Sequence, residues 1–142
     1  MKELRYSNED VTKIKKDINF TNNDGVTTLF LAVCHQQSEL VKALVNAGAN
    51  VNLTNLQNVS PLFMAAEKGY LNLVTYLVDK KANIDAMHSE YWTPILVAAD
   101  NKHIEIVKFF IANNASYNEN DPKIQAISEQ LNEKPNLSLK MT

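Results

Sequence analysis

A short pattern of residues returns three times along this chain of 142 residues, at a fixed spacing of 33. It is Thr-Thr-Leu at 27–29, Ser-Pro-Leu at 60–62 and Thr-Pro-Ile at 93–95. Two small or β-branched residues and then a set of apolar residues at helical spacing follow every copy. Self-similarity at such a period predicts a solenoid, in which each repeat is stable only against its neighbours.

Each copy also ends in a similar way, with Gly-Ala-Asn-Val-Asn at 48–52, Lys-Ala-Asn-Ile-Asp at 81–85 and Asn-Ala-Ser-Tyr-Asn at 114–118. Through these repeated starts and ends, the chain resembles the ankyrin repeat family. The family pattern is a turn, T-P-L-H, paired alanines, a short helix pair and G-A-D-V-N. The resemblance covers residues 22–119. It implies an all-α fold, an ankyrin-repeat solenoid of stacked helix–turn–helix units with β-hairpin loops.

The same register divides the chain into segments. Residues 11–19 lie one period before 44–52, which indicates a degenerate half-repeat. An Asp-Pro start signal at 121–122 and an apolar stripe of Ile124, Ile127 and Leu131 predict a last helix that covers the third repeat. The predicted segments are an N-terminal half-repeat cap at 1–21, repeats at 22–54, 55–87 and 88–120, a C-terminal capping helix at 121–134 and a flexible tail at 135–142.

Helix signals recur inside each repeat. A Thr or Ser precedes the first helix of every copy, and we expect its hydroxyl to cap a backbone N–H there. The first helices are predicted at 28–35, 61–68 and 94–101, and the second helices at 38–46, 71–79 and 104–112. The family often has glycine in a left-handed turn between the two helices, and the three copies have Gln36, Gly69 and Lys102 there. It often has a second such glycine after the second helix, and the copies have Gly48, Lys81 and Asn114 there. Each non-glycine residue held there costs on the order of 1 kcal/mol.

Composition excludes several classes of function. The formal net charge of −2 offers no basic field for phosphate, so nucleic acid is a poor partner for this chain. No apolar run is long enough to span a membrane, and no signal peptide opens the chain, so we expect a cytoplasmic protein, with secretion as an effector left open. No Cys/His spacing resembles a zinc site, and we expect neither a metal nor another cofactor.

Catalysis is not expected. Cys34 and His35 are adjacent, but neighbours on a helix point about 100° apart and do not face one another. The chain has no phosphate-binding loop and no G-x-S-x-G motif. We therefore expect a protein that is not an enzyme.

The resemblance implies that hairpin tips and first helices form a concave binding face. On that face Val26, Val59 and Trp92 hold equivalent positions, and we expect them to form an exposed apolar ridge beside Leu56 with an acidic border. Large aromatic residues are enriched at binding hot spots, so Trp92 is the leading anchor, and its truncation should cost little stability. The candidate protein-binding residues are Asp24, Val26, His35, Leu56, Gln57, Val59, Glu67, Lys68, Glu90, Tyr91, Trp92, Asp100 and Asn101.

The favoured function is a non-catalytic module that mediates protein–protein interaction through this face. The partner would be another protein, with a basic and apolar docking surface, and the chain itself would be monomeric. Two alternatives stay open: a structural or assembly unit without a partner site, and a microbial effector that acts on a host protein. The family also suggests hydroxylation of Asn52, which matches the asparagine that asparaginyl hydroxylases recognise, but a structural asparagine that hydrogen-bonds the hairpin is the favoured explanation.

Overall fold

The computed structural model describes residues 17–89 and 91–132 of the chain. Within these residues the structure has seven helices in four groups along the chain. Three groups are pairs, and the last is a single helix. The helices are α2 (Thr28–Cys34), α3 (Ser38–Asn46), α4 (Pro61–Lys68), α5 (Leu71–Asp79), α6 (Pro94–Asp100), α7 (Ile104–Ala112) and α8 (Pro122–Asn132).

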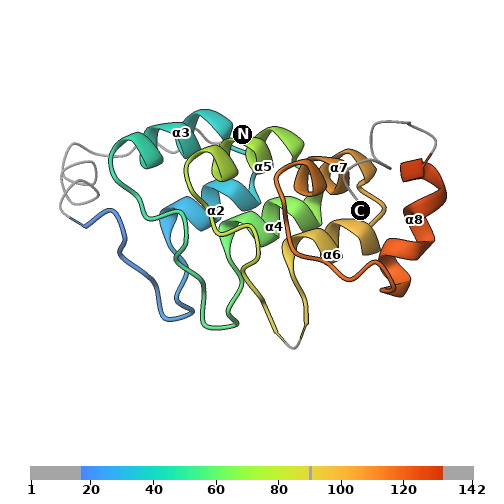
Figure 1. Ribbon diagram of the computed structural model, residues 1–142. Helices are drawn as coiled ribbons and strands as arrows, with labels where there is room; N and C mark the ends of the chain where they lie inside the picture. Colours follow the sequence, from blue (N-terminus) through green and yellow to red (C-terminus); the bar gives the residue numbers. More distant parts are fainter. Residues whose placement is uncertain (1–16, 90, 133–142) are drawn as a thin grey trace.

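The helix pairs stack side by side into an elongated solenoid (Figure 1). One layer holds α2, α4 and α6, a second layer holds α3, α5 and α7, and the connecting loops project from the first layer away from the second. The predicted all-α solenoid is confirmed. The loops close like hairpins through backbone bonds such as Asn55 N–H to Val59 C=O at 3.1 Å, although the described part of the chain has no strand longer than the single bridge between Thr21 and Thr27.

Small residues allow the first-layer helices to pack closely. The paired positions predicted from the repeat, at 32–33, 65–66 and 98–99, are each at most 3% exposed. Because a large side chain there would separate neighbouring repeats, these pairs fix the stacking distance. The largest fully buried side chains lie around them and include Leu29, Leu62, Ile95, Leu77 and Phe110.

Side-chain caps begin two of the three first-layer helices. The Oγ1 atom of Thr27 accepts from Phe30 N–H and the Oγ atom of Ser60 accepts from Phe63 N–H, each at 3.0 Å. The expected cap at Thr93 is wrong, because its hydroxyl is buried without a hydrogen-bond partner among the described residues. Its φ is −116°, compared with −87° and −89° for the other two residues.

The left-handed turns fall where the repeat predicts them. Gln36, Gly69 and Lys102 have φ of 54°, 78° and 60°, and Gly48, Lys81 and Asn114 have φ of 101°, 72° and 62°. A third row of left-handed residues lies at the hairpin tips, where Gly25, Asn58 and Tyr91 have φ of 73°, 63° and 72°. The sequence analysis missed this row.

One inter-repeat hydrogen bond recurs along the stack. The side chains of Asn19, Asn52 and Asp85, spaced one period apart, accept from the backbone N–H of Asn50, Asn83 and Ser116 at 2.8, 2.7 and 2.8 Å. The bond from Asn50 to Asn19 places the described end of the predicted N-terminal half-repeat in the same register, while residues 1–16 lie outside the described part.

The C-terminal helix α8 covers the other end of the stack. Its predicted stripe of Ile124, Ile127 and Leu131 is at most 2% exposed, and α8 packs on α6 and α7. The helix as described ends at Asn132, and the predicted tail at 135–142 lies outside the described residues.

Candidate protein-binding groove

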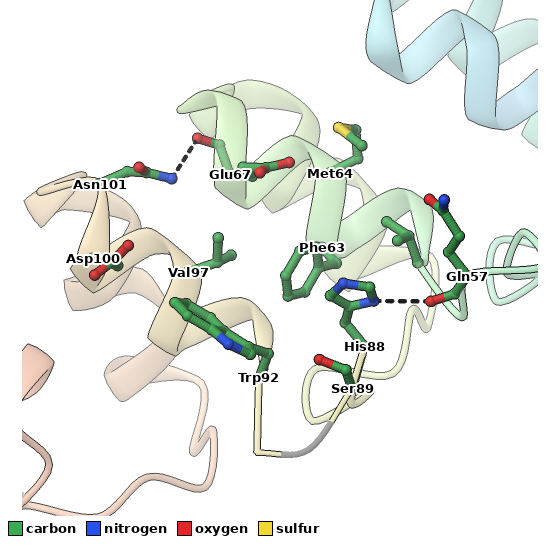
Figure 2. A pocket seen from close by; sticks show the side chains of 11 residues that line it. Gln57, Phe63, Met64, Glu67, His88, Ser89, Trp92, Val97, Asp100 and Asn101 are labelled. Atoms are coloured by element: carbon green, nitrogen blue, oxygen red, sulfur yellow. Dashed lines mark hydrogen bonds between the residues drawn. The ribbon is translucent and has the colours of Figure 1, made fainter.

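A groove of about 410 Å³ opens between the second and third repeats, on the side where α4 and α6 meet the hairpin loops (Figure 2). Its apolar part comes from Phe63, Met64 and Val97 on the two helices and from Trp92 on the third hairpin. Glu67 and Asp100 contribute carboxylates near the helix ends (Figure 2). The remaining lining residues are Gln57, Val59, His88, Ser89 and Asn101.

Two histidines bridge the repeats at opposite ends of this groove. At the hairpin end, His88 donates from Nδ1 to the Gln57 carbonyl at 2.9 Å, and its ring lies 5.0 Å from that of Phe63. At the helix end, His103 donates from Nε2 to the Glu67 carbonyl at 2.9 Å, and Asn101 Nδ2 donates to the same oxygen at 3.2 Å. These bonds hold the second and third repeats at a fixed separation, so the groove is preformed.

Trp92 is not the free surface anchor that the sequence predicts. Its side chain is half-buried and packs against the hydrophobic core. The ammonium of Lys123 lies over the ring, 4.8 Å from its centroid. The expectation that Trp92 stands clear of the core is wrong, because α8 supplies a cation that covers one side of the ring. Trp92 still lines the groove, as a wall of the site.

The predicted exposed apolar ridge is also wrong. Val59 is 6% exposed and belongs to the core, and Val26 is half-buried against it. Both residues directly precede a helix cap, where the chain turns their side chains toward the stack. The exposed apolar groups of the hairpins lie at other positions, with Leu56 at 76% and Tyr91 at 82% exposed.

The other predicted site residues are distributed over a wider surface. Gln57, Glu67, Asp100 and Asn101 are exposed and line the groove. The exposed residues outside its lining are Asp24, His35, Leu56, Lys68 and Tyr91. Glu90 lies outside the described residues.

The sequence analysis missed an apolar row on the first-layer helices. Leu31, Met64 and Val97 hold the same position in successive repeats, and the last two line the groove. Leu31 is 46% exposed and Val97 is 5% exposed, so the row becomes more covered toward the third repeat. The available signal was an apolar residue at this position in all three copies.

Cys34 occupies the position in the first repeat that Glu67 and Asp100 hold in the next two. Burial raises the pKa of the Cys34 thiol, the Lys68 ammonium opposes the shift and the Glu67 carboxylate adds to it. A raised pKa keeps the thiol protonated near neutral pH, which is the unreactive form. Across the described ranges no group of three or more His, Cys, Asp and Glu side chains could hold a metal ion.

Asn52, the candidate for hydroxylation, has a structural role. Besides accepting from Asn83, its side chain donates from Nδ2 to the Lys81 carbonyl at 3.2 Å. Asn19 and Asp85 occupy the same place in the stack and make the equivalent acceptor bond. The side chain therefore joins successive repeats.

Comparison with known proteins agrees with this geometry. A family model described as ankyrin repeats, in three copies, matches residues 4–88 and 29–121. A search of the curated proteins finds no match. Ankyrin repeats are generally protein–protein interaction modules and typically non-enzymatic. No helix among the described residues is both long and apolar enough to cross a membrane. From the matched length and the stacked helix pairs, the chain belongs to the ankyrin repeat family.

Proposed function

We propose that this chain is a non-catalytic module that binds a partner protein through the groove between the second and third repeats and the hairpin tips beside it. The single observation that carries the proposal is the combination of a preformed groove with two large apolar side chains next to it, Leu56 and Tyr91, at 76% and 82% exposed. Folding alone gives no reason to keep such groups in water. Burying them in an interface would stabilise the complex in proportion to the apolar area covered.

The backbone at Tyr91 supports this interpretation. Its φ of 72° lies in the left-handed region, which a bulky residue rarely adopts, and the first repeat has glycine at the same position. A residue held in such a conformation costs on the order of 1–3 kcal/mol, and such strain clusters at functional sites. Tyrosine there weakens the fold and presents an aromatic ring to solvent, which is a feature of binding surfaces.

Mutation of the exposed groups tests the proposal. Proteins captured from the native lysate by the wild-type chain would be identified and titrated against Leu56→Ala and Tyr91→Ala variants. Leu71→Ala is the matched control, since Leu71 is also an exposed apolar residue but lies on α5 in the second layer. We expect Tyr91→Ala to weaken partner binding by about 2 kcal/mol, roughly thirtyfold, with an unchanged circular dichroism spectrum.

A structural unit without a partner site predicts a different result. In that case the wild type and all three variants would retain the same proteins to the same extent. A loss of binding in Leu71→Ala alone would move the interface to the second helix layer.

A further inference from the structure

The groove holds two carboxylates that form no ion pair with a lysine in the described part of the chain. Glu67 on α4 and Asp100 on α6 occupy the same position in successive repeats, and both are exposed. The ion pairs of residues 17–89 and 91–132 join Lys42 with Glu39 and Lys108 with Glu105, so neither groove carboxylate is neutralised by a described lysine. Lys68 and Lys102 follow the acids closely in sequence, but neither lines the groove.

The two carboxylates flank an apolar and aromatic space. The groove volume of about 410 Å³ lies within the range of small ligand pockets, so it has room for one flat polar group. Met64 and Phe63 on α4 and Val97 on α6 line this space, together with His88 and Trp92 from the third hairpin (Figure 2). A group bound here would meet negative charge at one end and apolar or ring surface along its length.

The ring of Trp92 already contacts a cation within the chain. Lys123 Nζ lies 4.8 Å from the ring centroid, yet Lys123 is not part of the groove lining. The Trp92 ring itself does line the groove. Cations are attracted to the faces of indole rings, so the part of Trp92 that faces the groove can act in the same way.

We propose that the groove receives an arginine side chain of the partner protein, an inference that rests on the proposed binding function. A guanidinium is planar, stacks on aromatic rings and donates hydrogen bonds in a fixed fork that suits carboxylates, whereas a lysine ammonium is a compact and strongly hydrated point charge. Glu67 and Asp100 accept these bonds from either side. The methylene groups of the arginine pack against Met64 and Val97.

Trp92 provides a direct readout, because it is the one tryptophan of the chain. The probes are acetyl-Leu-Arg-Leu-amide and the same peptide with citrulline, a neutral near-isostere of arginine, in the central position. Titration of each peptide into the purified full-length chain is followed by tryptophan fluorescence. We expect saturable binding of the arginine peptide and about tenfold weaker binding of the citrulline peptide, which corresponds to about 1.4 kcal/mol.

Charge-neutral variants identify the groups responsible. Glu67→Gln and Asp100→Asn should each reduce the preference for arginine over citrulline by about threefold, which is within the range for a partly exposed charge pair. Asp79→Asn is the matched control, because it removes one negative charge from an exposed position on α5 outside the groove. It should leave the preference unchanged.

Two results would overturn the inference: equal affinity for the two peptides, or no saturable fluorescence change with the arginine peptide at millimolar concentration. Either result is distinguishable from failure of the proposed function. If partner capture still depends on Tyr91 and Leu56 while Glu67→Gln and Asp100→Asn have no effect on it, the surface binds a protein whose contact in the groove is not arginine.

Discussion

The two junctions between repeats use the same helices in the same register but connect their loops differently. At the first junction, where α2 packs on α4, the hairpins touch through backbone, with Leu56 N–H donating to the Asp24 carbonyl at 2.9 Å. At the second junction, where α4 packs on α6, side chains bridge the hairpins. His88 reaches the Gln57 carbonyl, and Asn58 Nδ2 reaches the Met87 carbonyl, both at 2.9 Å.

This difference shows that one repeat pattern can connect neighbouring hairpins either through backbone or through side chains. A backbone-to-backbone bond brings two loops as near as glycine allows, whereas an imidazole placed between loops acts as a spacer. The groove lies at the junction with the imidazole.

The largest expected effect tests the close contact at the first junction. A Cβ atom added at Gly25 would lie 2.9 Å from the Leu56 backbone nitrogen, at a φ of +73°. Because backbone cannot move aside cheaply, Gly25→Ala should lower the free energy of unfolding by about 2–3 kcal/mol, measured by urea denaturation. Gly48→Ala is the matched control, since its φ is +101° but no atom lies within 4 Å of the added Cβ.

For Gly48→Ala we expect a loss of about 1 kcal/mol from backbone strain alone. Equal losses in the two variants would contradict a tight contact at the first junction, and the comparison between the junctions would then fail.

The second prediction concerns the histidine that spans the second junction. A Cβ atom at Gly69 would lie 2.7 Å from Cε1 of the His103 ring. Gly69→Ala should therefore displace the ring, break its bond to the Glu67 carbonyl and cost about 2 kcal/mol. In a His103→Ala background only backbone strain remains, and the cost should fall to about 1 kcal/mol.

Urea denaturation of the four chains in this double-mutant cycle gives the coupling energy between the two residues. Additive losses would show that His103 does not hold the second junction in the way the hydrogen bond indicates.

The third prediction relieves strain. Lys102 has a φ of 60°, so Lys102→Gly should raise the free energy of unfolding by about 0.5 kcal/mol, because the strain removed exceeds the entropy that glycine adds to the unfolded chain. Asn114→Gly, at a φ of 62°, should gain less, since asparagine tolerates this region. Thermal midpoints of the two variants provide the measurement, and a lower midpoint for Lys102→Gly would contradict the assignment of the turn.

The smallest expected effect depends on pH and comes from the first repeat. The pKa of Cys34 is raised in the fold, mainly by burial, so the folded chain holds this proton more tightly than the unfolded chain does. Its contribution to stability is present at neutral pH and is lost as pH rises above the ordinary thiol pKa of about 8.5. Urea midpoints of wild type and Cys34→Ala should therefore converge or cross on going from neutral to alkaline pH. A difference that does not change with pH would show that burial does not perturb the thiol.

Much of the fold could be predicted because its signals are local. The second helices of the repeats have the predicted bounds, and the first helices α2 and α6 end one residue earlier than predicted. Caps, prolines, apolar periodicity and left-handed turns depend on a few neighbouring residues. The missing cap at Thr93 shows the limit, because a threonine at the capping position of the repeat does not make the bond that its neighbours make.

The candidate site was predicted only in part. Gln57, Glu67, Trp92, Asp100 and Asn101 do line one groove, and the exposed positions of Leu56 and Tyr91 agree with the expectation. Val59 and Trp92 were expected to be exposed, and Met64 and Val97 were missed. Position within the repeat predicts which residues face the same side, but it does not predict how far each one protrudes.

The sequence by itself determined the period, the helix pairs and the strained turns of this protein, because each follows from interactions inside one repeat of 33 residues. The tertiary structure alone decided how the hairpins are connected at each junction. The bonds that set the spacing of the hairpins join residues 29 to 32 positions apart, such as Asn58 with Met87 and Leu56 with Asp24. Lys123 reaches the Trp92 ring from a different helix at the end of the stack. Exposure depends on these distant neighbours, and so the groove and the exposed groups beside it form only when the repeats pack together.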